Sequence, residues 1–257
     1  MRLQCRAAML APVYYIDYLA QLHERLAPRT YLEIGIRNGH SLAQCRSRGI
    51  GIDPAFEINQ ALPGAVSLVR ATSDDYFAGL QVSGERPFGD QVIDLAFIDG
   101  MHLFEFALRD FVNVERYVGP ASVVVFDDMF PRDIDEAARD RHTQAWTGDV
   151  FRLMLALREH RPDLVLIGVD TQPTGLLLVT GFDPVRRLPA GRVDMIAESE
   201  VRPDPQPIPD EVLQRQGTLA PDAALELLMQ HIEVLRASTD LARGGRSNVL
   251  KRLFTRA

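Results

Sequence analysis

Three aspartates follow two strongly apolar runs of the sequence, and together they could hold a metal ion. Asp99 comes after Val92–Ile98, and Asp127 and Asp128 come after Ser122–Phe126. Both runs are nearly continuous in apolar character, as strands buried in a parallel sheet are, and such strands present their carboxyl ends at one edge. Three carboxylates gathered there would raise one another's pKa values and destabilise the fold without a cation. Oxygen ligands in this number favour Mg²⁺, with Mn²⁺ or Ca²⁺ as alternatives.

His102 lies three residues after Asp99, where the next helix is expected to begin. Beside a cation and a hydroxyl group, an imidazole that titrates near neutrality would be a well-tuned general base. The alternative for His102 is a helix cap or a solvated side chain. Each aspartate taken alone could also close a strand-to-helix turn. Taken together, the four side chains favour metal-assisted deprotonation of a hydroxyl group.

A glycine turn follows an acidic strand near the start of the chain. The run Thr30–Ile34 contains Glu33 and leads to Gly35, Gly39 and then Ser41. This glycine spacing differs from the G-x-G-x-x-G of nicotinamide and flavin binders. Glycines let the backbone approach a ligand closely, whereas an acid at this place would repel a pyrophosphate and suit a cationic or amino-bearing ligand. The alternative is a plain strand-to-helix turn with a half-buried glutamate.

A second acid, Asp53, ends the next predicted strand about 20 residues after the first, a position where a carboxylate can accept both hydroxyls of a ribose. A turn-forming aspartate before Pro54 is the simpler alternative. Together with Glu33, Asp53 predicts a ligand that combines adenosine with a positively charged appendage.

The elements that must position these residues form an α/β pattern. Apolar residues at helical spacing predict a first helix over Tyr15–Leu26. The predicted strands are Thr30–Ile34, Gly49–Asp53, Ala65–Val69, Val92–Ile98, Ser122–Phe126, Leu164–Val169 and Leu176–Thr180. Helices are predicted between them over 40–48, from Ser73 as N-cap, over Leu103–Val118 and over Val150–His160. The last two strands are joined by a hairpin-length turn, so the last strand should be antiparallel. The pattern predicts a doubly wound, seven-stranded Rossmann-like sheet.

The composition divides the chain further. Residues 184–210 hold six of the 16 prolines, which indicates a linker or surface arm. The predicted division lists 1–27 as an N-terminal helical segment, 28–183 as the sheet domain, 184–210 as the linker, 211–241 as a C-terminal amphipathic helix and 242–257 as a basic tail. The apolar stripe of the C-terminal helix should pack on the domain or on a second subunit, so a homo-oligomer is one expectation.

Charge and composition exclude several classes of protein. The 257 residues are 46% apolar and 25% charged, as in an ordinary globular protein, and the net charge of −7 argues against a surface devoted to nucleic acid. The tail 242–257 carries five basic residues and no acid, so it could meet a membrane face or an acidic partner, or be a solvated end. No apolar run approaches the roughly 18 residues of a membrane span, so no integral membrane contact is expected. Two cysteines favour a reducing compartment, hence the cytoplasm.

The motifs resemble those of class I S-adenosylmethionine-dependent methyltransferases over about residues 28–182. They are Glu-x-Gly-x-x-x-Gly-x-Ser from Glu33, Phe-Ile-Asp-Gly-x-His from Phe97, and Val-Val-Phe-Asp-Asp from Val124. More narrowly, they resemble the divalent-metal O-methyltransferases that include the macrocin and mycinamicin sugar methyltransferases. Catechol O-methyltransferase and cephalosporin-hydroxylase-type proteins are more distant.

This resemblance implies a role for each matching residue. Cofactor-binding positions would be Glu33, Gly35, Gly39 and Ser41 for the methionine end, Asp53 for the ribose, and Ser73 and Asp74 for the adenine. The metal ligands would be Asp99, Asp127 and Asp128, with His102 as the base. The loop Pro131–Asp149 would be a lid or acceptor wall in which Trp146 stacks on a ring, or else an ordinary connection with that tryptophan folded onto the core.

The implied activity is transfer of a methyl group from S-adenosylmethionine to a hydroxyl of a small-molecule or saccharide acceptor, with Mg²⁺ or another divalent cation. A vicinal diol that chelates the ion is the natural acceptor. One alternative is a catalytically lapsed protein that binds the cofactor and assembles through its C-terminal helix and tail. A hydroxylase is a lesser alternative, because the sequence shows no His-x-Asp facial triad with a distant histidine to hold iron.

Overall fold

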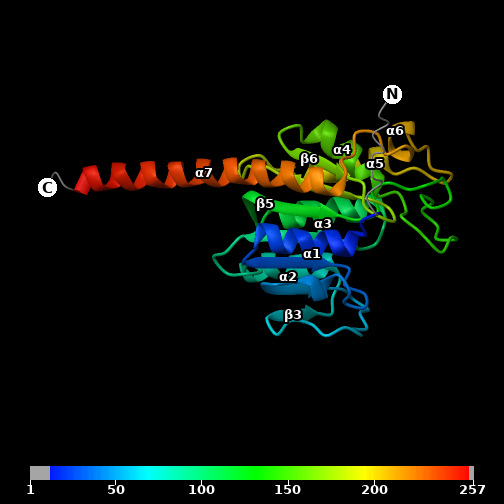
Figure 1. Cartoon of the computed structure of the whole chain (residues 1–257), viewed down its shortest axis with the longest axis horizontal. Coiled ribbons are helices and arrows are strands. Elements are labelled where there is room, and N and C mark those ends of the chain that lie inside the picture. Colours follow the sequence, from blue (N-terminus) through cyan, green and yellow to red (C-terminus); the bar gives the residue numbers. More distant parts are fainter. Residues whose placement is uncertain (1–11, 255–257) are drawn as a thin grey trace, which may run out of the picture.

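The computed structural model describes residues 12–254, with side chains for residues 12–189 and 191–238 (Figure 1). A seven-stranded sheet runs through the molecule in the order β3-β2-β1-β4-β5-β7-β6. The strands are β1 (Thr30–Ile34), β2 (Arg48–Ile52), β3 (Val66–Val69), β4 (Ile93–Ile98), β5 (Val118–Phe126), β6 (Val165–Val169) and β7 (Leu176–Thr180). Strands β1 to β5 are parallel, and β7 is antiparallel to both β5 and β6. The predicted fold class and the antiparallel last strand are confirmed.

Helices cover both faces of the sheet (Figure 1). They are α1 (Tyr15–Leu26), α2 (Ser73–Ser83), α3 (Phe104–Glu115), α4 (Phe151–His160), α5 (Ala190–Glu200), α6 (Asp210–Leu213) and α7 (Pro221–Phe254), with a 3₁₀ turn η1 (Leu42–Gln44). Successive strand residues enter opposite cores: Leu95 and Phe97 pack with α1 and α7, whereas Ala96 and Ile98 pack with α2 to α5. Burial on both faces explains why the strands are continuously apolar.

Three local predictions are wrong, each because a side chain engages the backbone or another side chain. The helix predicted over 40–48 is only η1, because the Ser41 hydroxyl is directed to Glu33 and β2 already begins at Arg48. The helix predicted to reach Val118 ends at Glu115. Gly119 joins β5, where its N–H donates to the Ser122 hydroxyl.

The N-cap of α2 is Thr72, one residue before the predicted Ser73. Thr72 Oγ1 accepts the N–H of Asp75 at 3.1 Å, which satisfies a free donor of the first helical turn. Ser73 is therefore the first residue of the helix.

The predicted linker 184–210 is partly helical. Within it α5 packs against α3 and α4, with Val193 and Ile196 buried in the main core. The interpretation of the whole segment as an extended arm is therefore wrong for residues 190–200, and this helix belongs to the layer that covers one face of the sheet.

The C-terminal helix α7 packs on the domain through its first half, as one of the two expectations had it. Ala224, Leu225, Leu228 and Ile232 are buried with α1 on the sheet face. The helix runs to Phe254, beyond the predicted end at Leu241, and its second half extends away from the body (Figure 1). Residues 1–11 of the N-terminal segment and 255–257 of the basic tail lie outside the described residues. No helix of the described chain is long and apolar enough to cross a membrane.

His23 of α1 should make stability depend on pH. Its side chain is 1% exposed, neither ring nitrogen has a hydrogen-bond partner in the described chain, and burial lowers its pKa to about 4. The unfolded chain, with a histidine pKa near 6.5, binds the proton more readily below pH 6.5, so this contribution to stability is lost as the pH falls toward 4. Because of this residue, we expect the unfolding free energy to fall by about 2 kcal/mol when the pH is lowered from 7 to 5. Chemical denaturation at the two pH values would measure the fall.

The control for this prediction is His23→Phe, which keeps a ring beside Tyr31, on which the imidazole packs edge-on at 4.5 Å. The difference in unfolding free energy between pH 7 and pH 5 should be smaller in this variant by the same amount. An unchanged difference would show that His23 does not titrate on unfolding.

Candidate active site

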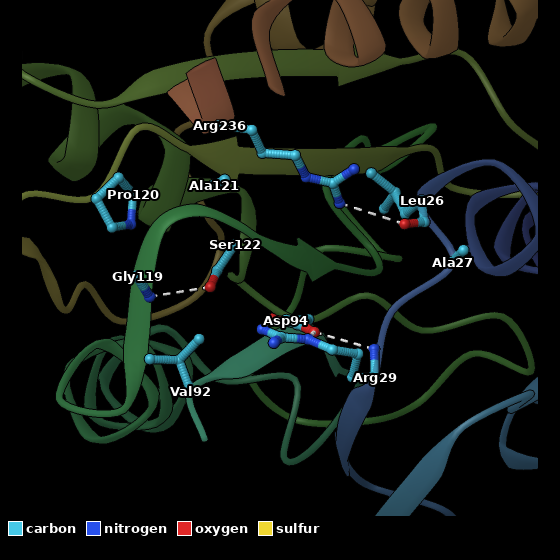
Figure 2. A pocket seen from close by; sticks show the side chains of 10 residues that line it. All are labelled: Leu26, Ala27, Arg29, Val92, Asp94, Gly119, Pro120, Ala121, Ser122 and Arg236. Atoms are coloured by element: carbon cyan, nitrogen blue, oxygen red, sulfur yellow. Dashed lines mark hydrogen bonds and ion pairs between the residues drawn. The ribbon is translucent and has the colours of Figure 1, made fainter. Parts of the chain in front are cut away.

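Two large cavities lie at opposite edges of the sheet. The first, about 500 Å³, is at the amino ends of β1, β4 and β5, where Arg29 pairs with Asp94 and Arg236 donates to the Leu26 carbonyl (Figure 2). It contains none of the predicted site residues. The second, about 490 Å³, is at the carboxyl ends of the same strands. Its lining includes Gly35, Asp53, Asp99, His102, Asp127 and Asp128. The structure therefore brings six predicted residues together at the edge where the fold predicts a ligand.

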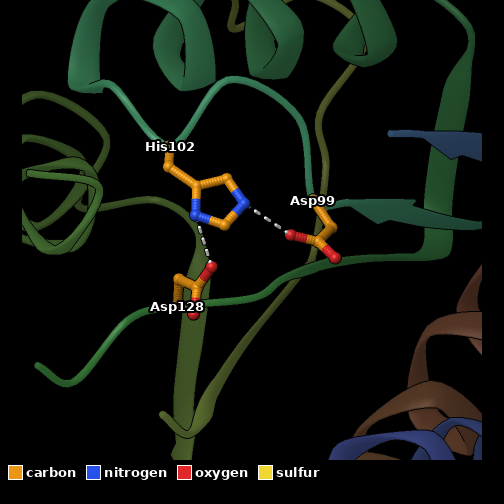
Figure 3. Close-up of side chains that lie close together, drawn as sticks. All are labelled: Asp99, His102 and Asp128. Carbon is orange, nitrogen blue, oxygen red and sulfur yellow. Dashed lines mark ion pairs between the residues drawn. The ribbon is translucent and has the colours of Figure 1, made fainter. Parts of the chain in front are cut away.

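His102 bridges two carboxylates at the centre of this cavity (Figure 3). Its Nε2 lies 3.0 Å from Asp99 Oδ1, and its Nδ1 lies 2.8 Å from Asp128 Oδ2 and 2.9 Å from the Trp146 carbonyl oxygen. One ligand atom from each of Asp99, His102 and Asp128 lies within 4.8 Å of the others, a group that could hold a metal ion. This group differs from the predicted ligand set, since it contains His102 in place of Asp127.

Asp127 lines the same cavity, directly after β5, and accepts the Asp128 N–H at 2.9 Å. Burial and the charges of Asp128 and Asp99 raise its pKa well above the usual range. Burial also raises the pKa of Asp99, although the hydrogen bond from His102 opposes the shift. These directions show that negative charge at this place is costly, so the donor set fits a divalent cation, which would offset that charge.

The pKa of His102 is shifted upward. Burial lowers it, but the hydrogen bonds to Asp128 and Asp99 outweigh burial and raise the pKa well above its ordinary value. In this arrangement the carboxylates of Asp99 and Asp128 favour the protonated imidazole that bridges them. It can act as a base only when these carboxylates are engaged elsewhere, which again fits a cation in the site.

Two glycines let neighbouring loops approach the centre. A Cβ on Gly35 would lie 1.9 Å from the carbonyl oxygen of Asp99, and a Cβ on Gly148 would lie 1.7 Å from that of His102. Both have positive φ, at +87° and +57°. The turn after β1 and the end of loop 131–149 therefore rest directly on the backbone of the site. Gly148 was missed by sequence reasoning, because its close contact involves a segment that is distant in the chain.

Glu33 lies beneath the glycine turn and does not line the cavity. Its carboxylate accepts hydrogen bonds from the Tyr31 hydroxyl at 2.7 Å and from the Ser41 hydroxyl. It is fully buried, and burial raises its pKa to about 8. Gly39 is also outside the lining, with the Ile58 side chain beside it. Of these two predicted cofactor residues, Glu33 therefore supports the turn from below, and Gly39 is the last residue of the turn.

Asp53 does face the cavity. Its Oδ2 accepts the N–H of Arg37 at 2.9 Å and its Oδ1 accepts that of Ala55 at 2.7 Å, so both oxygens are held in place. The structure does not bring Ser73 and Asp74 to the cavity lining. Asp74 instead pairs with Arg109 at 3.0 Å.

Loop 131–149 forms a wall of the site. The Trp146 ring stacks on the His102 ring, with centroids 5.1 Å apart and planes 7° from parallel, and its Nε1 donates to the Ala138 carbonyl. Asp149, fully buried, accepts the N–H of Phe104, two residues after His102. Loop 131–149 lines the cavity, as the wall interpretation expects, and its tryptophan stacks on His102.

Sequence reasoning missed several residues of the cavity: Tyr15, Arg37, Arg141, Gln144, Pro173 and Thr174. Tyr15 comes from α1, where its N–H donates to the Gln172 carbonyl at 3.0 Å and its ring stacks on Phe97. Burial, followed by the charges of the aspartates, raises its pKa. No local pattern marks Tyr15, because its place depends on pairing with the β6–β7 turn.

Comparisons with known proteins show a match to one family of domains and similarity in fold to several solved structures. Residues 32–129 match a family model described as a methyltransferase domain. The cofactor-bound Rv0187 from MTB is similar in structure, with a TM-score of 0.50, 17% identity, and coverage of 68% of this chain and 83% of that one. The O-methyltransferase TomG from Streptomyces achromogenes, in complex with SAM, has a TM-score of 0.48, 22% identity, and coverage of 64% and 78%. The comparison with curated proteins found no match.

The sheet order, with its antiparallel β7 between β5 and β6, is that of the Rossmann-like methyltransferase fold. Residues 32–129, the segment that matches the methyltransferase domain, hold the glycine turn, Asp53 and the aspartates of the site.

Gly35→Ala should abolish cofactor binding. The added methyl group would collide with the Asp99 carbonyl in a backbone conformation that disfavours alanine, so we expect unfolding free energy to fall by about 2 kcal/mol and the glycine turn to move. Calorimetric titration with S-adenosylhomocysteine would measure the loss of binding. Gly64→Ala is the matched control, because a Cβ there meets nothing within 4 Å. Binding by Gly35→Ala at the wild-type affinity would contradict the assignment of this turn to the cofactor.

Proposed function

We propose that this protein transfers a methyl group from S-adenosylmethionine to a hydroxyl oxygen of a small molecule, with the help of a divalent cation, in the first instance Mg²⁺. The observation that carries the proposal is the convergence of Asp99, His102, Asp127 and Asp128 on the cavity that also exposes Gly35 and Asp53. A carboxylate centre and a cofactor turn in one cavity are the requirements of metal-assisted O-methylation.

The cofactor side of the cavity is formed by the turn after β1 and the end of β2. We assign the ribose to Asp53, whose two oxygens are fixed by backbone N–H groups and keep lone pairs for hydroxyl donors. We assign the methionine end to the turn from Gly35 to Gly39, which Glu33 and Ser41 support from below. Ser73 and Asp74 are assigned to the adenine side by their place after β3.

The cation would be held by Asp99, Asp127 and Asp128. Three crowded carboxylates at a desolvated place suit a bound cation, as the raised pKa values of Asp99 and Asp127 indicate. When bound, the cation supplies Lewis-acid polarisation of hydroxyl oxygens and lowers their proton affinity. A vicinal diol, which offers two oxygens side by side, is the acceptor that suits this centre.

His102 is the base in this proposal. With the carboxylates of Asp99 and Asp128 engaged, its pKa returns toward the ordinary range, and a ring nitrogen can take the hydroxyl proton. Stacking on Trp146 and contact of Gly148 with its backbone hold the imidazole at the acceptor. The deprotonated oxygen then attacks the methyl carbon in line, and S-adenosylhomocysteine leaves as a neutral thioether. Most of the acceleration comes from holding the two reactants at attack distance.

The roles of His102 and Asp127 can be separated by comparing metal binding with turnover. Mn²⁺ binding followed by electron paramagnetic resonance should weaken at least about tenfold in Asp127→Asn, as removal of a ligand requires. His102→Gln should bind Mn²⁺ within a few-fold of wild type. Its transfer of labelled methyl from S-adenosylmethionine to catechol should fall by about 10²–10⁴, because it lacks the base.

The control for these variants is Asp90→Asn, an exposed aspartate outside the cavity that removes the same charge. A loss of Mn²⁺ affinity in His102→Gln together with normal binding by Asp127→Asn would make His102 a ligand and overturn the base assignment. Wild-type methyl transfer that is unaffected by a chelator would overturn the divalent cation.

A further inference from the structure

We propose that the acceptor carries an anionic oxygen group, a carboxylate or a phosphorus oxyanion, and that Arg141 binds it. This inference deepens the proposed function, on which it rests, because it assigns the class of acceptor to the same cavity. It depends on residues outside the segment that matches the methyltransferase domain.

Arg141 has a charge that the protein leaves uncompensated. Loop 131–149 contains three arginines, of which Arg132 pairs with Glu136, and Arg139 pairs with two carboxylates. Arg141 lines the cavity and forms no ion pair within the described chain. Its guanidinium lies 5.6 Å from the centre of the Trp146 ring and donates one long hydrogen bond, 3.4 Å, to the Gln144 carbonyl, so most of its N–H donors stay available.

The position of Arg141 assigns it to the acceptor. Trp146, over which its guanidinium lies, stacks on His102, the proposed base. The other uncompensated arginine of the cavity, Arg37, belongs to the turn after β1 beside Gly35, on the cofactor side. A group bound at Arg141 is therefore carried by the molecule that gives up its proton to His102.

The cavity also holds a hydroxyl without a partner. Thr174 is 3% exposed, its Oγ1 makes no hydrogen bond in the described chain, and it lines the same cavity from the β6–β7 turn. A buried polar atom left unpaired is costly, and an acceptor oxygen would satisfy it. Together with a forked guanidinium, which matches carboxylate and phosphate geometry, this favours a ligand rich in hydrogen-bond-accepting oxygens.

Electrostatics explains why such a residue is needed. The chain has a net charge of −7, and the cavity contains Asp99, Asp127 and Asp128, so an anionic acceptor would be repelled without a local cation. Arg141 would attract the acidic end of the acceptor, while Asp99, Asp127 and Asp128 would hold a divalent ion for the diol end. The two charges would orient the acceptor between them.

The test uses binding of three related diols to the full chain saturated with S-adenosylhomocysteine and Mg²⁺. The diols are protocatechuate, the corresponding uncharged benzyl alcohol, and the corresponding phosphonate. Trp146 is the only tryptophan, so its fluorescence reports binding at the site without turnover. Wild type should bind one of the two acids at least about tenfold more tightly than the alcohol, as a charge-assisted hydrogen bond predicts. The tighter acid identifies the anion.

Arg141→Gln should bind the acids and the alcohol within about threefold of one another, with the affinity for the alcohol unchanged. The matched control is Arg192→Gln, which removes an exposed arginine of α5 outside the cavity and should keep the preference. Equal affinities in wild type, a preference retained by Arg141→Gln, or failure of all three diols to bind would each overturn the assignment.

Transfer of labelled methyl to the same diols separates this inference from the proposed function. Methylation of acid and alcohol with equal kcat/KM in wild type would overturn the anion site and support O-methylation. Binding of the acids that depends on Arg141, without any methyl transfer, would support the anion site and contradict the proposed function.

Discussion

Crowding of negative charge at the ends of β4 and β5 is the constraint on which the site depends. Asp127 is buried and Asp99 half-buried next to Asp128, and the raised pKa values of Asp99 and Asp127 reflect both desolvation and mutual repulsion. In the described chain His102 relieves this repulsion by donating to two of the three carboxylates. The parallel sheet imposes the arrangement, since adjacent strands in register must end beside each other.

The surrounding structure limits how this charge can be accommodated. Gly35 and Gly148 admit backbone where no side chain fits, so neither loop can withdraw without exposing the site. Loop 131–149 is held at its far end by Arg139, which pairs with Asp149 at 2.5 Å and with Glu105 at 2.6 Å. Because Asp149 also accepts the N–H of Phe104, the same carboxylate fixes the loop and the start of α3. His102, between them in space, has little freedom to move away.

The sequence predicted most of the fold because both faces of the sheet are buried. Nearly continuous apolar runs marked the central strands β4, β5 and β7, and the hairpin-length turn after β6 marked β7 as antiparallel. It failed where a single hydrogen bond decides an element, as at Ser41, which faces Glu33, and at Gly119, which joins β5 through Ser122. It failed again for α5, because the prolines on either side of this helix suggested an arm, although Val193 and Ile196 supply the burial that makes a helix stable.

The site was predictable to the extent that topology fixes it. Residues that end adjacent parallel strands must converge, so Asp99, Asp127 and Asp128 followed from strand boundaries alone. The group of side chains that could hold a metal ion contains His102 in place of Asp127. This difference did not follow from the strand boundaries, because it depends on the positive φ angles of His102 and Asp128. Spacing in the sequence carries no information about such backbone conformations.

The residues that line the cavity come from two parts of the chain, one inside and one outside the segment that matches the methyltransferase domain. The glycine turn after β1 and the carboxylates lie within residues 32–129, the segment that matches the methyltransferase domain. Tyr15, Arg141, Trp146 and Thr174 lie outside it and come from α1, loop 131–149 and the β6–β7 turn. Beside the site α1 and the β6–β7 turn are joined, because the Tyr15 N–H donates to the Gln172 carbonyl. In the proposed function, the groups that carry out methyl transfer lie within the matched segment, whereas Arg141 and Thr174, which we propose contact the acceptor, lie outside it.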